Sequence, residues 1–133
     1  ELGRGAWSGR RRLMPAEPKP ISEALVSLDI SKAALLKPVV EIIAQARHIR
    51  QLGSSALALC LMAQGVLDAH IDLRGILRST DVAAGLFILK EAGGAYSLYG
   101  VPGGDMGLTR QSKVELIAAS GGNLLAMIHD LMH

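Results

Sequence analysis

Asp81 is the residue whose type and position best suit metal chemistry in this chain. It follows Thr80 in the run RSTDVAAGLFILKEAGG, residues 78–94, where Thr80 is a good N-cap and Gly93 a good stop signal. This pattern predicts a helix that opens at Asp81, and the small residues 83–85 predict that the helix packs closely against a neighbour. A carboxylate oxygen is the kind of hard ligand that Mg²⁺ prefers. The simpler alternative is that Asp81 only complements the helix dipole.

A second set of residues has the chemistry to hold an anion. Gly53, Ser54 and Ser55 stand where the helix of SSALALCLMAQG begins, and free backbone N–H groups at a helix start bind anions or hydroxyls. Ordinary capping by a serine explains the same residues. Arg74 and Arg78 flank the segment before Asp81, and an arginine can hold a phosphate through two parallel hydrogen bonds. They are equally well explained as surface charges.

Other ionisable residues receive structural interpretations. We expect Asp68 to cap or turn a strand, His70 to be a surface or core residue, and Glu91 to serve the end of its helix. His129 and His133 lie four residues apart on the last helix, a spacing that can bind metal, but a solvated terminal face explains them better. The sequence suggests no Ser-His-Asp or Cys-His arrangement and no phosphate-binding glycine loop.

The elements that must position these residues alternate along the chain. A buried helix is predicted from Ser54 to Gly65, because it is apolar on nearly every face. Other helices are expected from Pro38 and from Asn123, the latter burying Leu125, Ile128 and Met132. Strands are predicted at 23–29, 47–51, 69–73, 95–99 and 114–120, and loops at 74–79 and 101–113, where Asp105 receives no chemical role. This order favours an α/β fold with a mostly parallel sheet flanked by helices.

The amino-acid composition gives further information on the kind of domain and its partners. The chain has 133 residues, of which half are hydrophobic and only 3% aromatic, so we expect one domain with an aliphatic core. Residues 1–20 read as a loop or hairpin with a linker, and residues 21–133 as the α/β domain. The net charge is only +2, with a local excess of arginine near the N-terminus, and this predicts no nucleic-acid partner.

Cellular location is inferred from what the sequence contains. No apolar run reaches the roughly 18 residues that a membrane span requires. Cys60 is the only cysteine and lies in the apolar run LALCLMA, which predicts a buried thiol in a reducing compartment, so we expect a cytoplasmic protein. The chain starts with Glu1 and its first residues read like the middle of a longer chain.

Two blocks together resemble the inositol monophosphatase family. They are residues 50–75, RQLGSSALALCLMAQGVLDAHIDLRG, and the run 78–94. The sequence Leu-Arg-Ser-Thr-Asp is most similar to that of archaeal members. The resemblance implies the C-terminal half of an αβαβα layered sandwich and a substrate that is a small phosphorylated sugar or polyol. It also implies that Asp81 binds a catalytic Mg²⁺ and that the turn at Gly53 contacts substrate. Asp72 matches the family's substrate-binding acidic residue, although a solvated strand end is the plain alternative.

The family's upstream DPxDGT motif does not occur in this sequence, so no catalytic residue is assigned in this chain. Two hypotheses follow. The first is that the chain is the C-terminal half of a Mg²⁺-dependent phosphatase for inositol monophosphate or fructose 1,6-bisphosphate, inactive without an N-terminal half and forming a homodimer when complete. The first hypothesis predicts an exposed apolar face where the other half should pack. The second is a non-enzymatic interaction or regulatory module that dimerises through that apolar face. Similar blocks occur in bisphosphate nucleotidases, so the substrate class stays open.

Overall fold

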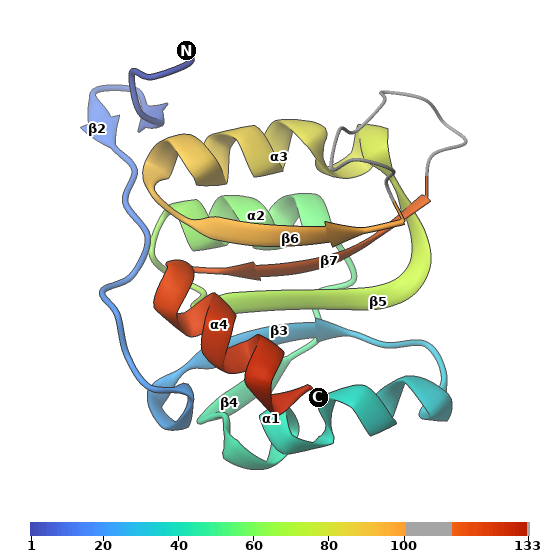
Figure 1. Ribbon diagram of the computed structural model, residues 1–133. Coiled ribbons are helices and arrows are strands. Elements are labelled where there is room, and N and C mark those ends of the chain that lie inside the picture. The colour runs from blue at the N-terminus through green and yellow to red at the C-terminus, as the bar shows by residue number, and fades with distance from the viewer. Residues whose placement is uncertain (101–112, 133) are drawn as a thin grey trace.

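A five-stranded sheet forms the centre of the protein. The computed structural model describes residues 1–100 and 113–132, so the predicted glycine-rich loop with Asp105, and also His133, lie outside the described residues. The strands are β3 (Leu25–Asp29), β4 (His48–Arg50), β5 (Ala69–Arg78), β6 (Ala95–Tyr99) and β7 (Lys113–Ala119), in the spatial order β4-β3-β5-β7-β6. Strands β3, β4 and β5 pair in parallel, and β7 runs antiparallel to both β5 and β6. Four of the five strands therefore point the same way, as predicted (Figure 1).

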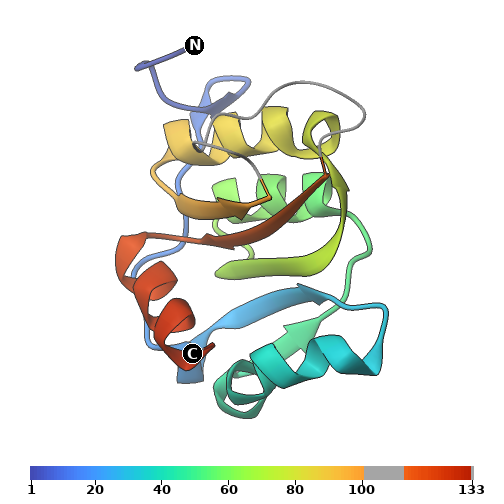
Figure 2. The same ribbon diagram turned by 45° about the vertical axis from the view of Figure 1, so that its right-hand side comes forward.

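Helices cover both faces of this sheet. The helices are α1 (Val40–Gln45), α2 (Ser55–Ala63), α3 (Ser79–Ala92) and α4 (Gly122–Leu131), with short 3₁₀ segments at Ile21–Glu23 and Ala33–Val39. Figures 1 and 2 show α2 and α3 side by side on one face and α1 and α4 on the other. No helix in the described part of the chain is long and apolar enough to cross a bilayer.

The alternation of side chains along each strand divides the core in two. On β7, Ile117 and Ala119 join the cluster under α1 and α4, whereas Leu116 and Ala118 join the cluster under α2 and α3. Successive strand residues point to opposite faces, so one strand feeds both cores. The few aromatic residues leave both cores aliphatic, as the composition predicts.

The close contact between α2 and α3 depends on one glycine. Gly85 of α3 is buried, and a Cβ atom at this position would lie 2.9 Å from Leu59 Cδ1 and 3.0 Å from Leu59 Cβ on α2. Only glycine allows the two helices to approach this closely without displacing Leu59. The close packing expected of the Gly85 region is confirmed.

A small hairpin precedes the main sheet. Strands β1 (Trp7–Ser8) and β2 (Arg11–Arg12) pair antiparallel, within the segment read as a loop or hairpin. Glu91, at the end of α3, accepts hydrogen bonds from the backbone N–H groups of Gly3 (2.8 Å) and Gly5 (3.0 Å). These bonds hold the pKa of Glu91 below its usual value and confirm its structural interpretation. The division of the chain at residue 20 stays a prediction.

Two predicted boundaries near the site are wrong. The loop expected at 74–79 is instead a continuation of β5, which extends to Arg78 because Leu77 and Arg78 pair with β7 after a register shift. Thr80 is not the N-cap of α3, since the helix begins at Ser79 and its N-cap is Arg78. Asp81 therefore lies in the first turn, where its Oδ2 accepts a hydrogen bond from the Arg78 backbone N–H at 3.1 Å.

Smaller differences concern the other helices. Pro38 lies inside a 3₁₀ segment, and the regular helix α1 begins only at Val40. In α4 the fully buried residues are Leu124 and Ile128, while Leu125 and Met132 are half-buried. Cys60 is half-buried on α2 and not enclosed in the core. The differences in burial depend on how each helix lies against its neighbours, which local sequence does not encode.

Candidate functional site

The turn that leads into α2 is held by two side chains. Ser54 is the N-cap, and its hydroxyl accepts a hydrogen bond from the Leu57 backbone N–H at 3.2 Å, which confirms capping by serine. Gly53 has a φ of 74°, a conformation that favours glycine, and its N–H donates to Asp29 Oδ1 at 3.1 Å. Asp29 is the last residue of β3. The turn is thus tied both to its own helix and to the neighbouring strand.

A row of polar side chains lies buried beneath this turn. In the parallel pairing of β3 and β5, Ser27 lies beside His70 and Asp29 beside Asp72. All four residues have no exposed surface. They occupy the alternate strand positions that face away from the core under α1 and α4, and Asp29 lies at the carboxyl end of β3, the kind of place where ligands of parallel sheets usually bind.

His70 connects this row to the helix. Its Nε2 lies 2.7 Å from Ser55 Oγ and its Nδ1 lies 3.0 Å from Ser27 Oγ. Burial is the largest cause that lowers the pKa of His70, against the raising effect of the Asp29 and Asp72 charges. The imidazole is therefore neutral at pH 7. From the sequence, His70 is expected to be either a surface or a core residue, and the structure shows that it is a core residue.

Asp72 and Arg74 form the strongest ion pair of the site. Arg74 Nε donates to Asp72 Oδ1 at 2.9 Å, Arg74 Nη2 donates to Oδ2 at 2.7 Å, and the Arg74 backbone N–H also reaches Oδ1 at 3.1 Å. The hydrogen bonds to Asp72 raise the pKa of Arg74 further. Asp72 is fully buried and the Arg74 side chain is 17% exposed, so Arg74 links the buried carboxylate to the protein surface.

These elements open onto one cleft of about 270 Å³. It is lined by Gly53, Ser54, Ser55, Ala56, Arg74, Leu77 and Asp81. The structure thus brings together five of the residues singled out in the sequence. Asp72 lies beneath them, and the exposed Arg78 is not part of the lining. Among the described residues that line the cleft, Asp81 is the only carboxylate and Arg74 the only cation.

Two places offer ligand atoms to a metal ion. Asp81 is exposed and presents a carboxylate to the cleft, which suits one ligand of an ion that also binds waters and phosphate oxygens. Asp29, His70 and Asp72 also have ligand atoms within 4.8 Å of one another. There, however, the Arg74 guanidinium already supplies a positive charge, 2.7 Å from Asp72 and 3.9 Å from Asp29. The cleft position of Asp81 therefore fits a divalent cation better.

Sequence reasoning missed Ser27 and Asp29. The signal was present in the strand LVSLD, in which two polar residues alternate with apolar ones on a strand that is otherwise buried. Such alternation is also typical of a strand with one solvated face. It identifies a site only once the pairing with β5 places His70 and Asp72 beside it.

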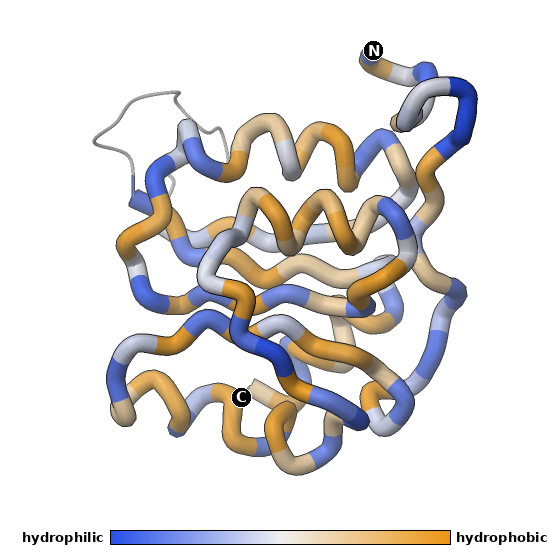
Figure 3. The backbone as a smooth tube through the Cα atoms, turned by 180° about the vertical axis from the view of Figure 1, so that it is seen from behind, coloured by the Kyte–Doolittle hydropathy of each residue, from blue (hydrophilic) through white to orange (hydrophobic). Residues whose placement is uncertain are grey.

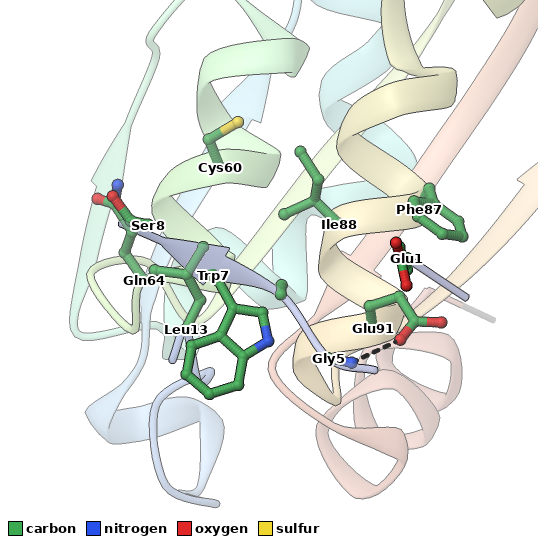
Figure 4. Close-up of a pocket in the computed structure, with 11 residues that line it drawn as sticks. Glu1, Gly5, Trp7, Ser8, Leu13, Cys60, Gln64, Phe87, Ile88 and Glu91 are labelled. Atoms are coloured by element: carbon green, nitrogen blue, oxygen red, sulfur yellow. Dashed lines mark hydrogen bonds between the residues drawn. The ribbon is translucent and has the colours of Figure 1, made fainter. Parts of the chain in front are cut away.

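A larger hollow of about 400 Å³ lies elsewhere, between the hairpin and the outer side of α2 and α3. Figure 4 shows Trp7 and Leu13 on one side, with Cys60 of α2 and Phe87 of α3 on the other. Its lining is largely apolar. Figure 3 shows α2 and α3 from behind, with hydrophobic residues along both helices. On the side of these helices that faces away from the sheet, called here their apolar outer face, Leu57 is 50% exposed and Phe87 43%.

Comparison with known proteins identifies the family. The model of the inositol monophosphatase family matches residues 2–132. The chain belongs to the inositol monophosphatase family. A fructose-1,6-bisphosphatase/inositol-1-monophosphatase of Thermococcus kodakarensis is 33% identical over 131 residues, which are 98% of this chain and 48% of that protein. The chain thus spans about half the length of this relative.

Solved structures agree with this assignment. An inositol monophosphatase–fructose 1,6-bisphosphatase superposes with a TM-score of 0.81 at 26% identity, over 97% of this chain and 50% of the other. Inositol monophosphatase II of Staphylococcus aureus gives 0.80 at 26% identity, over 98% and 47%. The predicted family and the predicted α/β fold class are both confirmed.

Proposed function

We propose that this family member provides the C-terminal half of a Mg²⁺-dependent phosphomonoesterase that hydrolyses inositol monophosphate, fructose 1,6-bisphosphate or both. One observation carries the proposal: a fixed guanidinium, a helix N-terminus and one carboxylate line the same cleft. This combination matches the charge pattern of a phosphate ester with its metal ion. The Thermococcus relative is a fructose-1,6-bisphosphatase/inositol-1-monophosphatase, which supports the same substrate class.

Each residue of the cleft has a distinct task in this proposal. The helix start at Ser54 and Ser55 offers backbone N–H groups to an anionic or hydroxyl group of the substrate, while the Gly53 N–H donates to Asp29 and fixes the turn. Arg74, oriented by Asp72, holds a phosphate oxygen, and Arg78 adds positive charge nearby. Asp81 supplies one oxygen ligand to Mg²⁺. When bound, the metal polarises the phosphate and its attacking water.

This chain alone does not complete the active site. A single carboxylate binds Mg²⁺ weakly, and the sequence carries no DPxDGT motif. We therefore assign no catalytic residue here and expect negligible activity of the 133 residues by themselves. The remaining half of the fold would cover the apolar outer face of α2 and α3. Formation of a homodimer and a cytoplasmic location belong to the same proposal.

Restoring the other half tests this function. A fusion would join the part of the Thermococcus relative that this chain does not match to residue 1 of this chain. We expect the fusion to release phosphate from fructose 1,6-bisphosphate or inositol 1-phosphate only with Mg²⁺, and the chain alone to release almost none. Asp81→Asn should abolish the rate, whereas Asp130→Asn, at an exposed position on α4, should leave it unchanged.

Two results would contradict the proposal. A folded fusion without Mg²⁺-dependent hydrolysis would favour the alternative of a non-enzymatic dimerising module. A robust rate from the chain alone, lost in Asp81→Ala, would show that the other half is not required.

A further inference from the structure

We propose that His70 and Asp29, buried beneath the cleft, are positioning residues that orient Ser55, Arg74 and the Gly53 turn and thereby set the affinity of the cleft for a phosphate group. The proposal rests on the proposed function, because it concerns the same cleft. Neither residue was assigned a role from the sequence. Both act through neighbours and have no surface exposed to a ligand.

The cost of burial is the first argument. Ser27, Asp29, His70 and Asp72 have no exposed surface and Ser55 has 4%. Burying polar groups is unfavourable unless each finds a partner, and apolar residues of similar size would pack there with less cost. A polar cluster concentrated at one point beneath a cleft is therefore best explained by what it holds in place.

The second argument is the direction of the hydrogen bonds. Ser55 Oγ lies 2.7 Å from His70 Nε2 and 3.3 Å from Asp72 Oδ2. The Asp72 carboxylate can only accept, so the single Ser55 hydroxyl proton must go to Asp72 if both contacts are hydrogen bonds. His70 must then donate from Nε2–H, and its bare Nδ1 must accept from the Ser27 hydroxyl.

This tautomer gives one continuous chain of donors and acceptors. It runs from the Ser27 hydroxyl through His70 to Ser55, then to the Asp72 carboxylate, which holds the Arg74 guanidinium. Each proton is used once. The opposite tautomer would leave Ser55 and Asp72 facing one another as two acceptors. His70 thus determines the orientation of a hydroxyl that lines the cleft.

Asp29 holds the other side of the same turn. Its Oδ1 accepts the Gly53 N–H, while its buried Oδ2 has no hydrogen-bond partner among the described residues. That oxygen lies 3.9 Å from both His70 Nε2 and Arg74 Nη2. Among the described residues, the polar groups that face His70 are Ser27 and Asp29 of β3, Asp72 and Arg74 of β5, and Ser55 of α2.

Substitution at His70 tests the proposal with inorganic phosphate as the probe. Phosphate would be titrated into the ¹⁵N-labelled chain, following the amide signals of Gly53 and Ser55 and the Arg74 Nε–H signal. We expect His70→Phe to weaken phosphate binding by about tenfold, a typical effect of losing a supporting residue. His70→Gln should retain most of the affinity, because its amide N–H can replace the Nε2 donor.

Smaller changes guard against a folding defect. Ser55→Ala removes the central link with little change in volume and should behave like His70→Phe. Asp29→Asn keeps the oxygen that accepts from Gly53 and should bind better than Asp29→Ala. Ser31→Ala, an exposed serine just after β3, should bind as the parent does. Dispersed amide spectra must be preserved in every variant.

The possible failures can be told apart. If phosphate shifts the cleft signals equally in the parent and in His70→Phe, the positioning role is wrong and the proposed function stands. If phosphate shifts none of these signals in the parent, the anion site of the proposed function fails. In that case unchanged Ser55 and Arg74 signals in phosphate-free His70→Phe would also overturn the positioning role.

Discussion

Arg74 donates two parallel hydrogen bonds to Asp72, from Nε to Oδ1 at 2.9 Å and from Nη2 to Oδ2 at 2.7 Å. The two residues lie two positions apart on β5, so their side chains leave the strand on the same face. The Asp72 carboxylate is fully buried, and Arg74 lines the cleft. One ion pair therefore joins the interior of the sheet to the surface on which a phosphate would bind.

Arg74→Ala should destabilise the fold by about 3 kcal/mol, because it leaves the buried Asp72 charge without a partner. Arg74→Lys should lie between this variant and the parent, since an ammonium keeps the charge but not the two-pronged geometry. Urea unfolding at pH 7 measures both. The exposed Arg50 side chain donates to the Ile49 carbonyl and to no other described residue, so Arg50→Ala serves as the control. Equal unfolding midpoints for Arg74→Ala and Arg50→Ala would refute the argument.

The lowered pKa of His70 predicts a loss of stability in mild acid. Its pKa in the folded state lies below the ordinary value of 6.5. As the pH falls through 6.5 the unfolded chain gains a proton that the folded chain does not, so the free energy of unfolding decreases until the folded pKa is reached. His70→Gln lacks this proton. Between pH 7.5 and 5.5 the parent should lose more stability than the variant, and parallel losses would contradict the prediction.

Gly85→Ala should destabilise the protein by roughly 1–2 kcal/mol, because its new Cβ would press on Leu59 across the contact between α2 and α3. Gly122→Ala is the matched control, since a Cβ there meets no atom of the described part of the chain within 4 Å. Alanine favours the helix at both positions, so the control should be neutral or stabilising. Thermal unfolding of both variants would show whether the two effects have opposite signs, and a stabilising Gly85→Ala would disprove the close packing.

The apolar outer face of α2 and α3 predicts association of the chain. We expect the 133-residue chain to self-associate with rising concentration in sedimentation velocity, because Leu57 and Phe87 lie about half exposed on that face. Replacing both with glutamine should reduce the association at little cost to stability. Val40→Gln, an exposed apolar position on α1 in the opposite layer, should not. Association that persists in the double variant would place the interface elsewhere.

Local signals predicted much of the architecture. Ser54 caps α2 and Gly93 ends α3, because a cap hydroxyl and a left-handed glycine act on their own helix and nothing else. The alternation of helices and strands also predicted a mostly parallel sheet. The two sequence blocks that resemble the family were sufficient to identify it, since such signatures lie within short stretches of chain.

Features that depend on pairing between strands could not be predicted from the local sequence. The sequence of segment 74–79 is typical of a loop, but pairing with β7, for example of Leu77 with Val114, extends β5 through this segment to Arg78. The antiparallel direction of β7 likewise depends on its partners. Strand length and direction are set by hydrogen bonds between segments distant in sequence, and no local pattern records them.

The sequence by itself determined the family, the layered α/β class and the residues with suitable chemistry around Gly53, Arg74 and Asp81, because each depends on residue type and short spacing. Only the tertiary structure decided that these residues share one cleft and that a buried network supports it. Ser27 and His70 lie 43 positions apart, yet they are neighbours across two parallel strands. The register that joins them is chosen by burial of the whole sheet, which is a property of the folded chain and not of any one segment.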